Sequence, residues 1–400
     1  MAAPFGGLAR PTGESDAVAG VAPRYVATPG STDEAAEVMR IAAAHDLAVV
    51  ARGAGTKQHW GLPPRRLDLV VDTRRLTGIV EHAAGDLVVV VRAGTPLSEL
   101  AEKLAPAGQQ LALDPMPGAT VGGTVAVNTS GPRRMQYGTA RDLLIGITVV
   151  RADGKVAHSG GKVVKNVAGY DLGKLMTGSY GTLGLITRCA FRLHPLPAET
   201  AYVTRRVDTV VEAGARATAV RRSQVVAAGI ELDAPPGGDV EVAVLLEGTP
   251  EGVSDRAAAA ADLLDGDVGA SAPPWWGAYP WRPGDIGLKL TAPLSQVAAL
   301  TTAARAAAEP YAVPLHVRGS AGVGVLYAGL PGDTDPVAVT AVVEQLRTVA
   351  EHVVVLTAPA AVRERLDVWG PVDGLDLMRR VKAQFDPDSL LAPGRFVGGI

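Results

Sequence analysis

The sequence predicts an α+β protein of two domains, the first of which holds an anion against its backbone. Its 400 residues exceed what one hydrophobic core usually contains. Residues 117–187 combine glycine-rich segments with short apolar runs. Glycine weakens a strand, so repeated glycines beside Val, Leu and Ile indicate that the backbone approaches a ligand closely. Exposed N–H groups at such positions form nests for anions such as a pyrophosphate.

Composition excludes several classes of protein. The net charge is −3, whereas a nucleic-acid binder usually carries a basic face. No apolar run approaches the roughly 20 residues that cross a bilayer, and the first 20 residues lack the pattern of a secretion signal. We therefore expect a cytoplasmic protein, with peripheral attachment to a membrane through a partner left open.

Cysteine and histidine usage limits the possible cofactors. Cys189 is the only cysteine, which excludes an internal disulfide and a cysteine-ligated iron–sulfur cluster within this chain. The seven histidines show no HxH, HxxxH or HxxE spacing. We expect no metal site.

Local patterns in the N-terminal half alternate between strand and helix. Residues 1–20 are expected to form a flexible tail. The sequence STDE at 31–34 is a capping box that predicts a helix, whose apolar face would be Ala35, Val38, Ile41 and Ala42. Strands are expected at 47–51, 69–72 and 87–91. Thr95 as N-cap and Pro96 at the first helical position predict a helix that ends at Leu104.

A change of texture marks a domain boundary at the segment LHPLP, residues 193–197. Beyond it, alanine-rich helical patterns cover 211–220, 255–264 and 294–308. Strand patterns lie between them at 240–246, 286–290, 322–327 and 352–356. This alternation predicts a first domain over 21–197 and a second α+β domain over 198–400.

The common nucleotide-binding motifs do not explain the glycines. No segment has the spacing of a P-loop, and the GAGTKQ segment ends in Gln58 where a Rossmann fingerprint needs glycine. The loops RGAGT and PGATVGG each follow an apolar strand, and each carries a hydroxyl, from Thr56 and Thr120. Two such loops suit the two phosphates of one pyrophosphate.

Four motifs in order carry a family resemblance: RGAGT, LDPMPGATVGGTVAVNTSG, YGTARD and GSYGTLGLIT. Together they closely resemble the FAD-binding domain of the vanillyl-alcohol-oxidase type, also called PCMH-type, over about residues 21–197. The resemblance implies a smaller α+β domain after it, the C-terminal cap or substrate domain of FAD-linked oxidases.

The same resemblance implies which residues contact FAD. Around the pyrophosphate and flavin edge it places Arg52, Gly53, Ala54, Gly55, Thr56, Lys57, Pro117, Gly118, Ala119, Thr120, Gly122 and Gly123. Along the flavin it places Asn128, Ser130 and Gly131, and beside the adenosine half Gly181, Thr182, Gly184 and Ile186. Tyr137, Gly138 and Asp142 would buttress this cradle. A helix cap or an ion pair with Arg141 explains Asp142 equally well.

The mode of FAD attachment follows from one position. Members with covalent FAD carry a histidine where this chain has Thr56, so the resemblance implies non-covalent FAD. His59 lies three residues later. A surface or cavity position accounts for it without a covalent bond.

Two segments narrow the resemblance. VVKNVAGYDLGKLMTGSYGTLG and the C-terminal residues 381–396 resemble the FAD-binding subunits of glycolate oxidase and their 2-hydroxy-acid dehydrogenase relatives, which usually have asparagine where this chain has Ala392. The implied function is oxidation of glycolate or a related 2-hydroxy acid to the 2-oxo acid, by hydride transfer to FAD. The implied partners are a larger flavin subunit and an iron–sulfur subunit. Two alternatives stay open: a stand-alone 2-hydroxy-acid dehydrogenase using a diffusible acceptor, and a non-catalytic FAD-binding electron-relay or assembly subunit.

Catalytic candidates lie in the second half. A 2-hydroxy acid needs a cation for its carboxylate and a base for its hydroxyl proton, and the candidates are Lys289, Arg318 and His316. Alternatively, Lys289 lies on a strand edge and points to solvent. His316 has a structural role in its alternative interpretation. Relatives carry a histidine-rich strand here, but residues 314–324 keep only His316 and no following acid, which disfavours a metal-assisted site. Three tryptophans would cover a flavin face or pack under a loop: Trp275, Trp276 and Trp281.

Overall fold

The protein folds into two compact units. The structure, a computed structural model, describes residues 5–114, 117–161 and 171–400. The first unit comprises Met1–Ser130, Gly138–Leu196 and Val372–Ile400, and the second comprises Gly131–Tyr137 and Pro197–Pro371. The division between Leu196 and Pro197 falls within the linker expected at 193–197. The C-terminal residues return to the first unit, and the short segment Gly131–Tyr137 joins the second, which differs from a simple division at residue 198.

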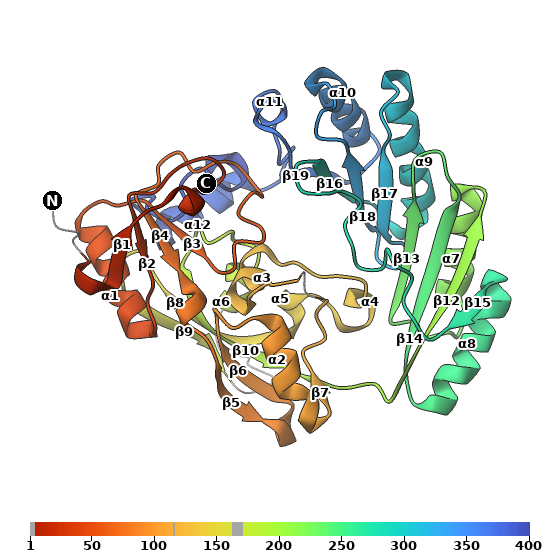
Figure 1. The fold of residues 1–400 in the computed structure, drawn as a ribbon, viewed down its shortest axis with the longest axis horizontal. Coiled ribbons are helices and arrows are strands. Elements are labelled where there is room, and N and C mark those ends of the chain that lie inside the picture. The colour runs from red at the N-terminus through yellow and green to blue at the C-terminus, as the bar shows by residue number, and fades with distance from the viewer. Residues whose placement is uncertain (1–4, 115–116, 162–170) are drawn as a thin grey trace. The chain divides into compact units, whose positions relative to one another are not determined.

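Two sheets organise the first unit (Figure 1). The smaller sheet contains, in spatial order, β1 (Ala9–Pro11), β2 (Tyr25–Ala27), β4 (Leu69–Asp72) and β3 (Val49–Arg52). The larger, antiparallel sheet contains β5 (Ile79–Ala83), β6 (Val88–Arg92), β10 (Leu185–Arg192), β8 (Leu144–Val150) and β9 (Val156–Gly160). A two-stranded pair joins β7 (Gln109–Gln110) to β11 (His194–Pro195). β2 and β3 both run parallel to β4. The RGAGT loop begins at Arg52, the last residue of β3, and so leaves the carboxyl end of this strand.

The N-terminal segment is part of this unit rather than a flexible tail. β1 pairs antiparallel with β2, and Phe5 and Val18 are buried in hydrophobic clusters. Asp16 is also buried. The apolar side chains of this N-terminal segment enter the core one at a time and do not repeat with the period of a helix or a strand.

Two helices of the first unit lie where the sequence predicts them. Ser31 caps α1 (Thr32–Ala44), its hydroxyl accepting from the Glu34 amide at 3.0 Å. The Glu34 carboxylate returns to the amide of Gly30 rather than that of Ser31. The helix α2 (Leu97–Leu104) ends as expected, but its N-cap is Pro96, and the Thr95 hydroxyl accepts from Gly78 instead. The remaining helices are α3 (Val121–Val127), α5 (Ala140–Leu143), α6 (Leu172–Met176) and α12 (Leu375–Phe385).

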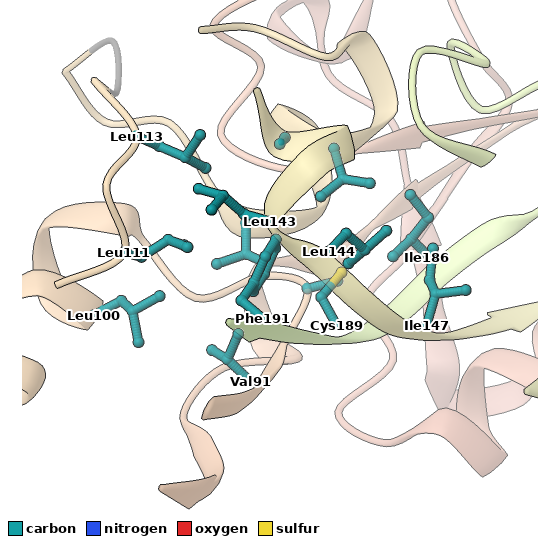
Figure 2. Packing of buried hydrophobic residues seen from close by; sticks show 14 of the residues in the cluster. Val91, Leu100, Leu111, Leu113, Leu143, Leu144, Ile147, Ile186, Cys189 and Phe191 are labelled. Carbon is teal, nitrogen blue, oxygen red and sulfur yellow. The ribbon is translucent and has the colours of Figure 1, made fainter. Parts of the chain in front are cut away.

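The main core of the first unit lies between the larger sheet and α2, α3 and α5. Figure 2 shows Phe191 and Cys189 from β10 among leucines of the surrounding segments. Phe191 is 1% exposed, and burial raises the pKa of the Cys189 thiol strongly. Cys189 is therefore an inert core residue.

An eight-stranded sheet forms the second unit. Its spatial order is β15 (Asp267–Gly269), β12 (Glu199–Val207), β14 (Val240–Gly248), β13 (Gly229–Ala234), β17 (His316–Ser320), β18 (Val325–Leu330), β16 (Ile286–Thr291) and β19 (His352–Thr357). The five helices and strands expected before residue 310, and the strand expected at 352–356, lie within five residues of their expected bounds, whereas β18 begins three residues later than expected. The helices are α4 (Arg134–Tyr137), α7 (Val210–Arg222), α8 (Pro250–Leu264), α9 (Val297–Ala308), α10 (Pro336–Arg347) and α11 (Ala360–Arg363).

The two faces of this sheet differ in chemistry. One face is covered by α7, α8, α9 and α10 (Figure 1), and its residues, such as Ile230, Leu232 and Val244, are at most 2% exposed. The other face carries charged and aromatic side chains. Directly paired residues of antiparallel strands share a face, so the register places Asp233, Arg318, Tyr327 and Lys289 in one row across four strands.

Candidate functional site

A pocket in the first unit lies where three glycine-rich segments meet. Residues of 50–58, 119–129 and 180–186 line it, together with Thr73 and Arg395. Its empty volume is about 850 Å³, including the part open to solvent. The RGAGT, PGATVGG and GSYGTLG motifs therefore form one site.

Close packing explains why glycine is needed in these loops. A Cβ atom on Gly53 would lie 2.1 Å from Oγ1 of Thr120. One on Gly122 would lie 2.7 Å from the Cβ of Ala93. The first two loops thus touch each other at a distance that only glycine allows.

Polar groups at the pocket lack partners within the described chain. The N–H groups of Ala54, Gly55 and Thr56 donate no hydrogen bond to another described residue. The buried hydroxyls of Thr120, Thr124 and Ser130 are likewise without a described partner; the first two line the pocket. Buried polar groups are normally satisfied, so these donors indicate a polar ligand.

Three cations line the pocket: Arg52, Lys57 and Arg395. The guanidinium of Arg52 donates to Asp16 at 2.9 Å and to Asp72 at 3.3 Å. Arg395 donates to the carbonyls of Gln58 and Trp60. Burial lowers the pKa of Lys57 to about 8, and its ammonium lies 4.8 Å from the centre of the Trp60 ring.

Most residues expected at the cofactor lie together. The pocket is lined by Arg52, Gly53, Ala54, Gly55, Thr56, Lys57, Ala119, Thr120, Gly122, Gly123, Gly181, Gly184 and Ile186. The lining does not include Pro117, Gly118, Asn128, Ser130, Gly138, Asp142 or Thr182. Gly131 belongs to the second unit. Most of the VVKNVAGY segment lies outside the described residues.

Several expected residues outside the lining have structural contacts of their own. Asn128 ends α3 in the left-handed conformation, with φ at 49°. Asp142 accepts from the amide and hydroxyl of Thr139 at 2.8 and 2.9 Å, which is the helix-cap alternative. The Thr182 hydroxyl donates to the Ser179 carbonyl. His59 is exposed and does not line the pocket.

In the second unit, Asp233 joins two of the three catalytic candidates. Its Oδ1 accepts from Nε2 of His316 at 2.6 Å and from Nε of Arg318 at 2.7 Å. Although burial raises the pKa of Asp233, these two hydrogen bonds bring it below its ordinary value. Arg318 also donates to the carbonyls of Ala278 and Tyr279, so this guanidinium is engaged by the protein.

Lys289, the third candidate, faces a different environment. Burial and, as the smaller cause, the charge of Arg134 lower its pKa to about 8. No described carboxylate lies within ion-pair distance of Lys289 or Arg134. Tyr327 lies between Lys289 and Arg318 in the row, and burial raises its pKa while Arg134 opposes the rise.

An aromatic segment covers part of this polar face. Tyr279 and Trp281 stack with ring centres 4.5 Å apart and an angle of 9°, and both contact the Tyr327 ring edge-on. Gly287 is required beneath them, because a Cβ there would lie 2.5 Å from the Trp281 ring. The tryptophans thus pack on the sheet of their own unit. The polar face and its aromatic cover form a cation-bearing surface.

Comparison with known proteins identifies the first site. Residues 23–160 match the sequence family described as FAD binding domain. This region is an FAD-binding domain.

Curated relatives of the FAD-binding domain are oxidoreductase subunits and dehydrogenases. Glycolate oxidase subunit GlcD of Bacillus subtilis is 32% identical over 216 residues, 53% of this chain and 46% of the relative. Glycolate oxidase subunit GlcE of Escherichia coli is 39% identical over 163 residues, 40% of this chain and 46% of the relative. A D-lactate dehydrogenase of Archaeoglobus fulgidus is 36% identical over 183 residues, which are 44% of this chain and 41% of the relative. The matched part spans about half the length of these relatives.

Solved structures extend the similarity to the whole fold. p-Cresol methylhydroxylase superposes with a TM-score of 0.74 at 17% identity, over 94% of this chain and 88% of that one. Alkyldihydroxyacetonephosphate synthase superposes with a TM-score of 0.71 at 17% identity, over 93% of this chain and 76% of that one. The expected fold, a PCMH-type FAD-binding domain with a second α+β domain, is confirmed.

The pocket of the FAD-binding domain fits its cofactor. FAD carries a pyrophosphate that accepts hydrogen bonds, and the pocket offers the N–H groups of Ala54, Gly55 and Thr56 and the hydroxyls of Thr120 and Thr124. Glycines at 53 and 122 allow the backbone to approach. These donors fit the pyrophosphate, the anion that the sequence predicts for this site.

Sequence reasoning missed three residues. Asp233 lies 83 positions from His316 and meets it through the pairing of β13 with β17. Arg134 follows the NTSG turn, directly after Arg133. Asp16 lies in the segment that the sequence predicts to be a tail. Only Arg134 had a local signal, a second consecutive arginine after the NTSG turn.

Within 5–114, 117–161 and 171–400, no three His, Cys, Asp or Glu side chains are grouped to hold a metal ion. Over the same part of the chain, no helix combines the length and apolarity of a membrane span.

Proposed function

We propose that this chain takes part in flavin-dependent oxidation of glycolate or a related 2-hydroxy acid to the 2-oxo acid. The FAD-binding domain supplies the redox cofactor, and relatives named as glycolate oxidase subunits and D-lactate dehydrogenase supply the substrate class. The observation that carries the proposal is the pair of cations Lys289 and Arg134 with no described carboxylate to neutralise them.

Cations without a counter-ion on a half-buried face favour an anionic ligand. Lys289 is mostly protonated at neutral pH, because its pKa is about 8 and a lysine is charged below that value. A carboxylate is the anion that 2-hydroxy acids share. We therefore assign Lys289, with Arg134 beside it, to the substrate carboxylate.

His316 and Arg318 have different roles in this proposal. Asp233 only accepts hydrogen bonds when ionised, so Nε2 of His316 carries the hydrogen and Nδ1 is the nitrogen that can take a proton. Arg318 holds the aromatic segment through Ala278 and Tyr279. When bound, FAD supplies an acceptor for the hydride leaving the substrate carbon.

The FAD is proposed to be non-covalent, since the described residues lining the pocket include neither histidine nor cysteine. Onward electron transfer through iron–sulfur clusters would need partner subunits, because one buried cysteine cannot ligate a cluster. We propose a larger flavin subunit and an iron–sulfur subunit, in line with the relatives that are named as subunits. Any attachment to a membrane would come through these partners.

Anaerobic titration tests the proposal. The purified chain is reconstituted with FAD, and its flavin absorption is recorded while glycolate or D-lactate is added without oxygen. Bleaching of the flavin band is the expected result. Lys289→Met should raise the substrate concentration for half-bleaching at least tenfold, whereas Lys103→Met, an exposed lysine of α2, should not change it.

The other outcomes discriminate between the alternatives. FAD that binds but is not reduced by either acid, in this chain or with its partner subunits added, favours an electron-relay or assembly subunit and overturns the catalytic proposal. Reduction in the isolated chain followed by turnover with a soluble dye favours the stand-alone dehydrogenase.

A further inference from the structure

Tyr180 occupies a strained backbone position in the wall of the FAD pocket. Its φ is 56°, in the left-handed region that a bulky aromatic residue rarely adopts. Its neighbours Gly178 and Gly181 have φ of 79° and 75°, and glycine takes such angles without strain. A third glycine would fit this turn more easily than tyrosine.

The turn is fixed in place by its backbone. The amide of Tyr180 donates to the carbonyl of Ala126 at 2.8 Å, and that of Gly178 donates to Val125 at 2.9 Å. Both acceptors belong to α3, the helix that follows the PGATVGG loop. The strain at Tyr180 is therefore maintained by the same helix that carries the pocket hydroxyl of Thr124.

A second aromatic residue supports the Tyr180 ring. Phe396, in the C-terminal segment of the same unit, lies with its ring centre 5.3 Å from that of Tyr180, at an angle of 33°. Both side chains are half-buried. Arg395, the residue before Phe396, lines the pocket together with Tyr180 and Gly181. Tyr180 thus contributes a partly exposed aromatic side chain to the pocket wall, and Phe396 packs against it.

We propose that Tyr180, backed by Phe396, stacks on a planar ring of FAD and thereby positions the cofactor. Strained residues concentrate at functional sites, where the surrounding structure maintains them. FAD offers two planar heteroaromatic rings, the isoalloxazine and the adenine, and both have the chemistry that an aromatic side chain recognises. The inference rests on the FAD pocket and is independent of the substrate.

Equilibrium binding tests the role of the ring. The apoprotein is titrated with FAD, FMN and ADP, and dissociation constants are obtained from flavin fluorescence or, for ADP, calorimetry. Tyr180→Phe keeps the ring and should bind FAD as the wild type does. Tyr180→Gly removes the ring, relieves the strain and should weaken FAD binding about tenfold or more.

Stability measurements separate a stacking role from a folding role. Tyr180→Gly should unfold at the same or a higher temperature without cofactor, because the glycine removes left-handed strain. Ala312→Gly relieves similar strain in the second unit, where φ is 53°, and should leave FAD affinity unchanged. Phe396→Leu should weaken FAD binding less than Tyr180→Gly does.

The ligand series identifies the ring. If Tyr180→Gly weakens FAD and ADP alike but not FMN, the adenine stacks there; if it weakens FAD and FMN alike, the isoalloxazine does. Unchanged affinity for all three ligands would overturn the inference while leaving FAD binding intact. Failure of the wild type to bind FAD would instead contradict the cofactor.

Discussion

Asp233 holds Arg318 at 2.7 Å between strands β13 and β17, while the Arg318 guanidinium donates to the backbone of the aromatic segment at Ala278 and Tyr279. One carboxylate thus fixes both a sheet residue and the cover above it. The guanidinium also lies 5.8 Å from the centre of the Trp275 ring. Arg318 is consequently a residue that orders the polar face.

Removing the charge of Asp233 should loosen this cover. We expect Asp233→Asn to cost about 1–3 kcal/mol of unfolding free energy, because a hydrogen-bonded charge pair that is mostly buried loses one partner. Urea unfolding followed by tryptophan fluorescence measures it. Asp267→Asn, on the exposed edge strand β15, is the control and should have little effect. An equal loss in both variants would contradict this role of Asp233.

Whether the sequence predicts a structural feature depends on how far apart in the chain the residues that form it lie. Local signals sufficed for the Ser31 cap and for the glycine loops, because the residues that define them are neighbours in sequence. The pairing of Asp233 with His316 and Arg318 depends on strand register, which no local pattern specifies. The N-terminal segment was read as a tail because Phe5, Asp16 and Val18 each make a separate contact and show no period. The return of residues 372–400 to the first unit depends on tertiary contacts of α12.

Gly53 tests the contact between the first two pocket loops. Gly53→Ala would place a Cβ 2.1 Å from Oγ1 and 3.3 Å from Cβ of Thr120, so the Thr120 side chain or the loops must shift. We expect FAD affinity, measured by flavin fluorescence, to fall about tenfold or more. Adding Thr120→Ala to this variant removes the clashing hydroxyl and should restore part of the FAD affinity. Gly85→Ala, which has nothing within 4 Å, serves as the control.

Asp16 links the N-terminal segment to the cofactor pocket. Its pKa is well below the ordinary value, chiefly through the hydrogen bonds from Arg10 and the Gly13 amide, with Arg52 adding to them against the effect of burial. Stability from a carboxylate with a depressed pKa is present above about pH 4, the unfolded pKa, and is lost as pH falls through the folded value.

Asp16→Asn should therefore be less stable than the wild type at pH 7, and the difference should shrink below about pH 4. Urea unfolding at several pH values measures this. FAD affinity should also fall, because Arg52 retains only Asp72. Asp46→Asn removes an exposed pair with Arg66 and should change neither. A difference that stays constant down to pH 2 would contradict the assigned ionisation.

The buried pair of Lys382 and Asp386 fixes the C-terminal segment to the FAD-binding unit. Lys382 Nζ lies 2.5 Å from Asp386 and donates to the carbonyls of Thr182 and Leu391, each at 2.8 Å. Asp386 is fully buried. Asp386→Ala should cost about 3–5 kcal/mol, because it leaves a buried lysine unpaired. Urea unfolding of this variant and of Lys382→Met with Asp386→Leu, which should be more stable than the single change, tests the pair. Asp376→Ala breaks an exposed pair on the same helix and should have a small effect.

Lys289 gives the proposed substrate site a pH dependence. A lysine holds a carboxylate only while protonated, and the pKa of Lys289 is about 8 because burial and the charge of Arg134 disfavour its charged form. The affinity for a 2-hydroxy acid should thus be constant below pH 7 and fall about tenfold per pH unit well above pH 8. Anaerobic flavin bleaching at each pH gives the half-saturating concentration. Lys289→Arg keeps its charge at all these pH values and should lose the alkaline decline. A decline that persists unchanged in Lys289→Arg would assign the titration to another group and remove Lys289 from the substrate site.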